Sequence, residues 1–337
     1  MNILFTSSGR RNYLIEYFKE ALKPFNGKVH SMNSYIFASA LWVSDYKVIS
    51  PLIYSGQYES FLLNYCLENE ITIVISLFDI DLPILSSLKK KFQDYNINII
   101  VGDEWLTSMA NDKWLTHKFL IENGFQYKPC FLSLNDFKSD LNNLTFDNPV
   151  FIKPRWGMGS LSVFKADSIE EVEFFYNLAK KQIQKSYLKF ESKADWENSV
   201  LIQSQLPGEE YGLDVINDLN GNYCTTIVKK KLAMRSGETD VAEIVEIPQL
   251  VDLGRKLSLL TKHPANLDVD VFYDGKNAYI LEINPRFGGG YPFSHESGVN
   301  LPLAIIKWQL GQEIEKEILK AKVGTICMKG IKLIKTY

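Results

Sequence analysis

The sequence predicts a protein of mixed α/β and α+β class, with a Rossmann-like N-terminal domain, a small lid domain and a C-terminal antiparallel-sheet domain. Before residue 102 the predicted strands are short, continuous apolar runs, which are typical of buried parallel strands that alternate with helices. After residue 150 apolar and polar residues alternate, as they do in antiparallel strands with one solvated face. The expected domains are residues 1–102, 103–199 and 200–337.

The composition is that of an ordinary globular protein. The chain has 337 residues, a formal net charge of −3, 46% hydrophobic and 23% charged residues, which leaves room for two or three domains. Near-neutral charge gives no electrostatic reason to expect a nucleic acid or a membrane as partner. Four scattered cysteines without a Cys-x-x-Cys pair argue against a disulfide framework or a zinc site. No stretch has the length of a signal peptide core or a membrane span, so we expect a cytoplasmic protein.

The first domain alternates predicted strands and helices. Residues 2–6, 71–77 and 97–101 predict buried strands, and residues 13–22 predict an amphipathic helix. This alternation implies a parallel sheet with right-handed crossovers. The turn at residues 7–11 has one glycine and lacks the Gly-x-Gly-x-x-Gly fingerprint, so a nicotinamide dinucleotide site is not expected.

Ligands of such sheets bind beyond the carboxyl ends of the strands. Four residues that directly follow predicted strands are therefore candidates to contact a substrate: Ser8, Gly9, Arg10 and Asp79. Turn formation by Ser8 and Gly9, and helix N-capping by Asp79, explain these residues equally well at this stage.

The lid is expected to contain a glycine-rich loop. Residues 150–153 predict a strand that ends at Lys153-Pro154, and the following loop contains Gly157, Gly159 and Ser160. Backbone amides of such a loop can hold phosphate oxygens. The loop is not a Walker A motif, because no Gly-Lys-Ser/Thr follows and no helix begins there. Taken alone, it is explained as well by a plain hairpin loop.

Helices are expected on both sides of this loop. Lys113 lies at the start of a predicted helix over residues 114–123, which ends at Gly124, a typical C-terminal stop. Residues 168–198 are charge-rich and predict further helix that closes the lid domain.

The most informative stretch is a predicted β-hairpin near the C-terminus. Asp268 and Asp270 alternate with aliphatic residues on the first strand, and residues 274–277 have turn composition. A connection of three or five residues would set Asp270 opposite Glu282. It would also set Asp268 opposite Asn284 and leave the aliphatic side chains together on the other face.

This register predicts a metal site. Cross-strand neighbours lie roughly 4.5–5.5 Å apart, so the carboxylates repel each other unless a cation lies between them. The oxygen ligands of Asp270, Glu282 and Asn284 suit Mg²⁺. The alternative is that these acids simply form the solvated face of a sheet. Arg286, just past the strand end, favours the metal site because arginine suits phosphate geometry.

The segment Glu282-Ile283-Asn284-Pro285-Arg286, with Asp270 on the preceding strand, resembles the metal-binding signature of the ATP-grasp superfamily. The closer resemblance is to its carbamoyl-phosphate-synthase-like branch, which includes the pyrrolysine-pathway carboxylate–amine ligase, and it covers nearly the whole chain. The resemblance implies the ATP-grasp fold, in which a Rossmann-like pre-ATP-grasp domain precedes the ATP-grasp lid domain and the C-terminal catalytic domain.

The resemblance also implies a nucleotide site. It matches a lysine on phosphate, a flexible phosphate-covering loop, an interdomain hinge whose backbone contacts adenine, and a glutamate on the ribose. The residues at these positions are Lys113, Lys153, Gly157, Gly159, Ser160, Gln203, Gln205, Leu206 and Glu210. Ser204 stands where the family commonly has glutamate, which leaves the preference for adenine open.

Three further positions are candidates. The run Lys229-Lys230-Lys231 follows a predicted strand over residues 223–228 and is expected to be a solvated basic turn, with Lys231 left open. The resemblance gives Arg235 a role on the transferring phosphoryl group or the substrate carboxylate. His295 follows the metal strand and is a candidate to line the substrate pocket, with a structural role as the alternative.

The expected function is that of an ATP-dependent carboxylate–amine ligase that forms an acyl phosphate and then an amide, with ADP and phosphate as products. Lys113 and Lys153 would hold phosphates, Mg²⁺ (or Mn²⁺) would bridge them, and Arg286 would stabilise developing charge. Phosphorylation of bicarbonate, as in carbamoyl-phosphate synthesis and carboxylases, is the alternative, and an ATP-binding regulator without turnover is the second. The expected partners are a small-molecule carboxylate and an amine, with homodimer formation left open.

Overall fold

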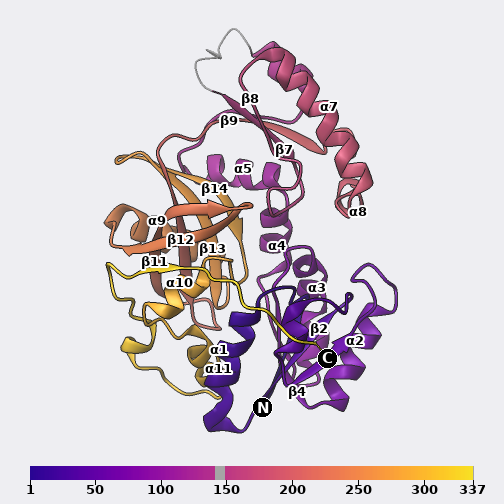
Figure 1. The fold of residues 1–337 in the computed structure, drawn as a ribbon, viewed down its shortest axis with the longest axis vertical. Helices are drawn as coiled ribbons and strands as arrows, with labels where there is room; N and C mark the ends of the chain where they lie inside the picture. The colour runs from indigo at the N-terminus through magenta and orange to yellow at the C-terminus, as the bar shows by residue number, and fades with distance from the viewer. Residues whose placement is uncertain (141–148, 337) are drawn as a thin grey trace.

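The computed structural model describes residues 1–140 and 149–336. Within these residues the chain folds around three β-sheets, one parallel and two antiparallel (Figure 1). None of the described helices is long and apolar enough to cross a membrane.

The N-terminal sheet is parallel and five-stranded, in the order β3-β2-β1-β4-β5. Its strands are β1 (Asn2–Thr6), β2 (Lys28–Asn33), β3 (Tyr46–Ile49), β4 (Ile71–Ser76) and β5 (Asn98–Ile100). Its helices are α1 (Asn12–Leu22), α2 (Tyr58–Glu68) and α3 (Asp81–Gln93). The predicted Rossmann-like arrangement is confirmed, and the strands are buried as their continuous apolar runs indicate.

The second sheet is antiparallel and four-stranded, in the order β6-β9-β7-β8, with helix α7 packed on it (Figure 1). Its strands are β6 (Cys130–Phe131), β7 (Val150–Pro154), β8 (Phe164–Ala166) and β9 (Val200–Ser204). The helices of this region are α4 (Glu104–Asn111), α5 (Lys113–Glu122), α6 (Leu134–Ser139), α7 (Ile169–Lys185) and α8 (Lys189–Ser192). Because β9 pairs with β7, the lid sheet extends past the expected boundary at residue 199; the division into three domains stays a prediction.

Helix α5 is fixed at its N-terminus by a polar contact that also reaches the lid. The Asp112 carboxylate accepts hydrogen bonds from the backbone N–H groups of Trp114 and Leu115, which satisfies the free amides of a first helical turn. The same carboxylate accepts hydrogen bonds from Nε and Nη2 of Arg155, the residue that follows β7. The start of α5 and the glycine-rich loop are therefore held in one place.

The third sheet is antiparallel and six-stranded, in the order β14-β13-β10-β11-β12-β15. Its strands are β10 (Glu209–Asn217), β11 (Tyr223–Arg235), β12 (Glu238–Val245), β13 (Asn266–Tyr273), β14 (Ala278–Asn284) and β15 (Ile326–Met328). The helices of this part are α9 (Pro248–Thr261), α10 (Tyr291–Glu296) and α11 (Leu301–Gln309). Helix α9 packs over the aliphatic face of the sheet, with Leu250 and Leu257 buried against Leu213 and Val269.

The predicted pairing of β13 with β14 is confirmed, but the predicted connection is wrong. Asp270 lies opposite Glu282 and Asp268 lies opposite Asn284. The connection has four residues, 274–277, rather than three or five, and a bulge between the two strands leaves Leu281 without a partner. With a four-residue connection, regular pairing would shift β14 by one position relative to β13. The bulge at Leu281 offsets this shift, so that the acids of both strands stay on a common face.

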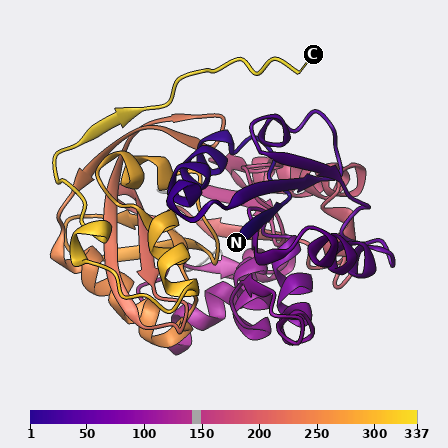
Figure 2. The same cartoon turned by 90° about the horizontal axis from the view of Figure 1, so that it is seen from below.

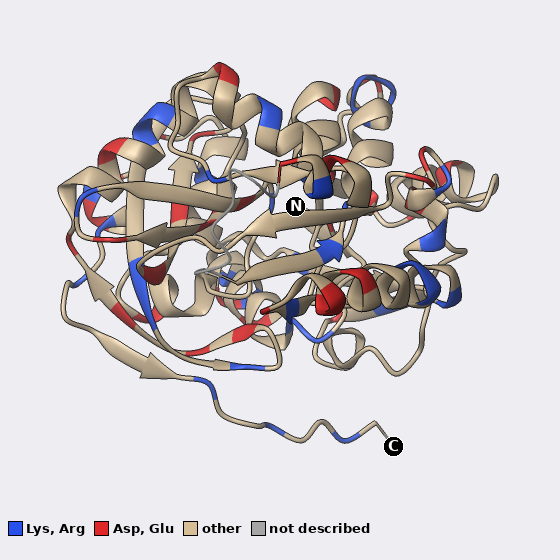
Figure 3. Ribbon diagram, turned by 90° about the horizontal axis from the view of Figure 1, so that it is seen from above, with Lys and Arg blue, Asp and Glu red and all other residues tan. Residues whose placement is uncertain are grey.

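The first and third sheets share one hydrophobic core. Helix α1 lies beside α11 (Figures 1 and 2), and the ring of Phe18 packs edge-on against Phe287 with centroids 5.9 Å apart. The lid reaches the N-terminal part through its α8 end, where the Tyr54 hydroxyl donates to Glu191 at 2.5 Å. Beyond β15 the chain runs extended along the outside (Figure 2). Acidic and basic residues are both spread over the fold, whereas the extended C-terminal segment carries only basic ones (Figure 3).

Candidate active site

A cavity of about 340 Å³ lies between the lid sheet and the polar face of the six-stranded sheet, a size within the range of small-molecule sites. It is lined by every residue predicted to bind nucleotide: Lys113, Lys153, Gly157, Gly159, Ser160, Gln203, Gln205, Leu206 and Glu210. Apolar side chains complete its walls, among them Phe151, Leu161, Val163, Met234 and Phe272. We call it the nucleotide cavity.

Two lysines converge in this cavity. The Lys153 ammonium is buried and donates to the Gln203 carboxamide oxygen at 2.5 Å, and the Lys113 ammonium donates to the carbonyl of Gly157. Burial, together with the charge of Lys113, lowers the pKa of Lys153 to about 8. Two cations held this close suit an anionic ligand, because an anion would offset their mutual repulsion.

The glycine-rich loop turns through a series of residues in the positive-φ region. Gly157, Gly159 and Ser160 all have positive φ, at 150°, 62° and 56°. Its far side touches the tip of the β11–β12 hairpin: a Cβ atom added to Gly237 would lie 2.6 Å from the Ser160 hydroxyl oxygen. Glycine at this tip therefore allows the hairpin and the loop to approach closely.

The hinge between the lid and the third sheet is held by backbone bonds. Ser204 and Gln205 donate their amides to the carbonyls of Pro129 and Pro149. Five residues after Gln205, the Glu210 carboxylate accepts a bond from the Lys231 ammonium at 2.6 Å. The hinge is thus a fixed wall of the nucleotide cavity.

Two of the three predicted metal ligands line this cavity. Asp270 and Glu282 both line it, and the Lys231 ammonium donates to Asp270 at 2.6 Å. Burial, and then the charges of Asp268 and Glu282, raise the pKa of Asp270, although Lys231 opposes the shift. Among the described residues, no group of three or more His, Cys, Asp or Glu side chains forms a ready-made metal cage.

This donor set fits Mg²⁺ all the same. Asp270, Glu282 and Asn284 offer two carboxylates and one carboxamide on adjacent strands, and Mg²⁺ characteristically binds few protein carboxylates while water and phosphate oxygens complete its shell. Burial first, and then the neighbouring charges of Asp268 and Glu282, raise the pKa of Asp270; a cation bound beside these carboxylates would favour the ionised form of Asp270.

A second cavity, of about 270 Å³, lies between the strand ends of the N-terminal sheet and the same polar face; we call it the substrate cavity. Four predicted substrate residues line it: Ser8, Gly9, Arg10 and Asp79. Asn284 and Arg286 line it as well, and Asp270 and Glu282 line both cavities. The two cavities therefore meet at the predicted metal ligands.

Arg286 bridges two sheets within the substrate cavity. Its guanidinium contacts Asp79, after β4, at 2.8 Å and Asp268, on β13, at 3.1 Å. Although burial opposes the charge, these two carboxylates raise the pKa of Arg286 above its ordinary value. Asp79 thus lies at the cavity wall, where it holds Arg286.

Two predicted site residues line neither of these cavities. The Arg235 side chain is 62% exposed at the end of β11 and pairs with Asp240; it lines an outer groove instead. His295, on α10, stacks on Tyr17 with ring centroids 3.6 Å apart and lies 3.2 Å from the Tyr291 hydroxyl. Both residues are close in sequence to site residues, but neither side chain lines the two cavities.

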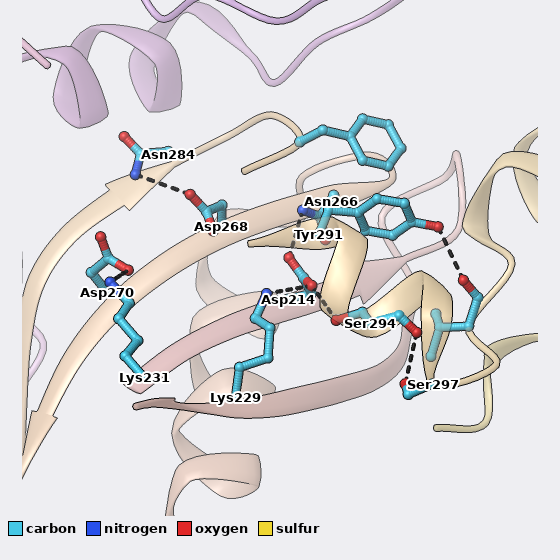
Figure 4. A network of polar contacts seen from close by, with 12 residues as sticks. Asp214, Lys229, Lys231, Asn266, Asp268, Asp270, Asn284, Tyr291, Ser294 and Ser297 are labelled. Atoms are coloured by element: carbon cyan, nitrogen blue, oxygen red, sulfur yellow. Dashed lines mark hydrogen bonds and ion pairs between the residues drawn. The ribbon is translucent and has the colours of Figure 1, made fainter. Parts of the chain in front are cut away.

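The lysine run, in contrast, is a part of the site that the sequence reasoning missed. The predicted solvated turn is wrong, because β11 continues to Arg235. Lys229 and Lys231 line the substrate cavity and point to Asp214 and Asp270 (Figure 4). Lys230 donates to Glu209 instead. The two-residue period of a strand, continued through the run, could have found this.

The arrangement of the sheets is the ATP-grasp fold. More narrowly, residues 3–100 match the family of PylC-like N-terminal domains. Residues 197–329 match the family described as ATP-grasp in the biosynthetic pathway with Ter operon. The predicted resemblance to the ATP-grasp superfamily is confirmed by these two matches.

Solved structures agree on the fold. The biotin carboxylase domain of Hydrogenobacter thermophilus 2-oxoglutarate carboxylase, with MgADP, ADP and bicarbonate, superposes with a TM-score of 0.73 and 15% identity over 96% of this chain and 73% of that one. The L-amino acid ligase of Bacillus licheniformis gives 0.68 and 16%, over 91% and 74%. N5-carboxyaminoimidazole synthetase of Staphylococcus aureus gives 0.67 and 14%, over 94% and 78%.

Among curated proteins, acetyl-CoA carboxylase dmxL1 of Cryptosporiopsis sp. is 26% identical over 194 residues, which is 57% of this chain. The match spans only 8% of that much longer protein.

Proposed function

We propose that the protein is an ATP-dependent carboxylate–amine ligase that forms an acyl phosphate and then an amide or peptide bond, releasing ADP and phosphate. The observation that carries the proposal is the meeting of two cavities at Asp270 and Glu282. One cavity has the size and the lysines for a nucleotide, and the other opens toward the strand ends of a Rossmann-like sheet. The likeness to an L-amino acid ligase supports the proposal.

The lysines and the glycine-rich loop would bind the phosphates. Lys113 and Lys153 supply positive charge inside a buried cavity, where electrostatic interactions are less screened than in water. The loop at residues 157–160 would cover the phosphates and exclude water from the reactive intermediate. Phosphoryl transfer depends on such positioning and charge neutralisation more than on a protein nucleophile.

Asp270, Glu282 and Asn284 would hold Mg²⁺, with Mn²⁺ as a substitute for the same oxygen ligands. When bound, the metal neutralises charge on the terminal phosphates. Arg286, fixed in place by Asp79 and Asp268, would stabilise charge that develops on the transferred group.

The hinge would bind the base and the ribose. Ser204 and Gln205 already donate their amides to neighbouring loops, so the backbone of Leu206 is our candidate for contact with adenine. Glu210 would accept from the ribose hydroxyls once Lys231, its present partner, turns toward phosphate.

Phosphorylation of bicarbonate is the second candidate. It is favoured by the likeness to a biotin carboxylase domain described in complex with bicarbonate. ADP release that requires an amine would distinguish ligation from a reaction that requires only bicarbonate.

Hydroxylamine trapping tests the proposal. Amino acids and other small carboxylates are supplied with MgATP, and hydroxylamine replaces the amine. We expect one class of carboxylate to yield a hydroxamate and ADP in equal amounts, because an acyl phosphate reacts with any strong nucleophile. AMP and pyrophosphate as products would instead mean an acyl adenylate, and the proposal would be wrong.

The substrates, the location and the domain division also belong to this proposal. We propose small-molecule substrates, a cytoplasmic location and the three-domain division given above. Sedimentation of the purified protein would decide between a monomer and a homodimer.

A further inference from the structure

Lys229 is buried at the floor of the substrate cavity. Its side chain is 2% exposed, yet it lines that cavity. Two glycines border it: a Cβ atom added to Gly290 would lie 3.3 Å from its ammonium nitrogen, and one added to Gly212 would lie 3.4 Å from its Cε atom. The absence of side chains at these two positions leaves the ammonium next to the open space of the cavity.

The Lys229 ammonium is paired with a buried carboxylate. Lys229 donates to Asp214 at 2.5 Å, and Asp214 is fully buried. Asp214 also accepts from the Ser294 hydroxyl at 2.5 Å and from the Asn266 carboxamide at 3.1 Å (Figure 4). With donors from three different elements, this carboxylate is fixed in position and fixes Lys229 in turn.

The ammonium still has donors to spare. A lysine carries three N–H donors, and the contacts of Lys229 with the described residues use one of them. Buried donors without acceptors are costly, and more so on a charged group. An acceptor from the cavity side would satisfy them.

Lys229 also stands in line with the predicted metal ligands. Glu282, Asp270, Gly212 and Lys229 follow one another across β14, β13, β10 and β11 as cross-strand partners. Side chains in such a row share one face of the sheet. The bare position at Gly212 leaves space between Lys229 and the carboxylates.

The other buried cations of the substrate cavity use most of their donors, although the Nε–H of Arg286 has no partner among the described residues. Lys231 donates to both Glu210 and Asp270. The two terminal nitrogens of Arg286 contact carboxylates. Lys229 therefore has the larger share of free donors beside the place where the cavities meet.

We propose that Lys229 binds an oxyanion in the substrate cavity, either the carboxylate of the substrate or the phosphate that the reaction releases, and that Asp214 positions it. The inference rests on the proposed function for the reaction, but it concerns a binding site that is separate from the nucleotide cavity. Gly212 lies between Lys229 and Asp270 in the sheet. The inference therefore predicts a substrate whose anionic oxygen binds on the Lys229 side of Gly212, away from the metal ligands.

The test is a binding measurement on the full-length protein. Calorimetry first gives the affinity for MgADP, and then orthophosphate or succinate is titrated into the MgADP complex. We expect Lys229→Met to weaken binding of at least one of these oxyanions tenfold or more, with the MgADP affinity changed less than twofold. Lys230→Met, on the same strand but pointing outward, should change neither affinity.

A second variant guards against misfolding, because Lys229→Met leaves Asp214 buried without its cation. Lys229→Met/Asp214→Asn removes both charges and keeps an acceptor for Ser294. It should bind MgADP normally and lose the same oxyanion binding. Loss of succinate binding alone would assign the site to the carboxylate, and loss of orthophosphate binding alone to the product.

Three results would overturn the inference: no binding of either oxyanion to the wild-type MgADP complex, unchanged binding by the double variant, or an equal effect of Lys230→Met. Failure of the wild-type protein to bind MgADP would be a different result, and it would count against the proposed function instead.

Discussion

The nucleotide cavity and the substrate cavity share one wall and are built in different ways. Asp270 and Glu282 contribute to both. The nucleotide cavity combines a few lysines and carboxylates with a largely apolar surface that includes Phe151, Leu161 and Phe272. The substrate cavity is bordered by cations that are paired with carboxylates from other elements.

Because of this difference, we expect the removal of a charged side chain to have different effects in the two cavities. In the nucleotide cavity Lys113 and Lys153 repel each other, so their charges serve a ligand rather than the fold. In the substrate cavity Arg286 holds the N-terminal sheet to the C-terminal sheet through its two carboxylates. The charged residues of the substrate cavity therefore contribute to the stability of the fold as well as to the proposed site.

The largest effect on activity is expected at the shared wall. Glu282→Ala should reduce ADP formation by about 100-fold or more, because preorganised groups around a transferring phosphoryl are each worth that much. Its unfolding free energy should change by less than about 1 kcal/mol, because removing one of two facing carboxylates relieves repulsion. A coupled ADP assay and urea unfolding measure the two quantities.

Glu246→Ala, at an exposed position after β12, is the matched control and should leave both quantities unchanged. Near-normal ADP formation by Glu282→Ala would remove this carboxylate from the proposed metal site.

The largest effect on stability is expected in the substrate cavity. Arg286→Met leaves Asp79 and Asp268 buried without their cation, which typically costs about 3–5 kcal/mol of unfolding free energy. Lys153→Met should cost far less, because burial already disfavours the Lys153 charge. Urea unfolding of the two variants compares the cavities directly.

A double-mutant cycle measures how strongly Asp79 and Arg286 are coupled. If Asp79 is used mainly to hold Arg286, Asp79→Asn combined with Arg286→Met should be less destabilising than the sum of the single changes. Strictly additive losses would mean that the ion pair does not link the two sheets.

The residues that the resemblance assigns to the nucleotide line one cavity, and most of them lie in continuous segments; their role in binding a nucleotide stays a prediction. The hairpin of acids can be recognised from its alternation and the glycine-rich loop from its composition, whereas the hinge was identified through the family resemblance. The register of Asp270 and Glu282 followed from strand alternation, although the bulge that leaves Leu281 unpaired was not predicted. A one-residue bulge leaves no mark in the alternation until the partner strand is known.

The substrate cavity could not be predicted in the same way because it is assembled across long sequence separations. Asp79 and Arg286 contact each other over 207 positions, and Asp214 meets Ser294 over 80. Lys229 was assigned to solvent because short charge runs usually are; the strand that carries it was taken to end at residue 228. Tertiary packing, which a single sequence does not display, brings these side chains together.

The nucleotide cavity should also respond to pH through Lys153. Because its pKa is lowered to about 8 by burial and by Lys113, the ammonium loses its proton as the pH rises above 8. MgADP affinity should therefore fall between pH 8 and 9, by less than tenfold, as charge is lost from the phosphate site. Calorimetry at pH 7, 8 and 9 measures this, and Lys153→Met should remove the dependence.

Stability should follow the opposite trend in the absence of nucleotide. The folded pKa of Lys153, about 8, lies below its ordinary value of 10.5, so the unfolded chain binds more protons between those pH values. Its contribution to the unfolding free energy then rises with pH across that window. A wild-type protein whose stability relative to Lys153→Met is the same at pH 8 and pH 10 would contradict the assigned shift.

The smallest effect is expected where the glycine-rich loop meets the β11–β12 hairpin. A methyl group at Gly237 would lie 2.6 Å from the Ser160 hydroxyl oxygen, and Gly237 has a φ of 79°. Gly237→Ala should therefore push the loop away from its closed position and weaken MgADP binding by about 3- to 10-fold. Limited proteolysis at residues 156–160 provides the second measurement, because the loop should be protected by MgADP in the wild-type protein and less so in the variant.

The matched control is Gly275→Ala, in the β13–β14 connection. Gly275 has a similar φ of 91°, but a Cβ atom there would meet nothing within 4 Å. Both variants pay the cost of a left-handed conformation, roughly 1 kcal/mol of stability, and only Gly237→Ala adds the collision with Ser160. If the two variants lose stability alike but only Gly237→Ala loses MgADP affinity and loop protection, the hairpin tip is part of the closure over the phosphates. Equal MgADP affinities would mean that the loop closes without the hairpin, and the nucleotide cavity would then depend on the lid alone.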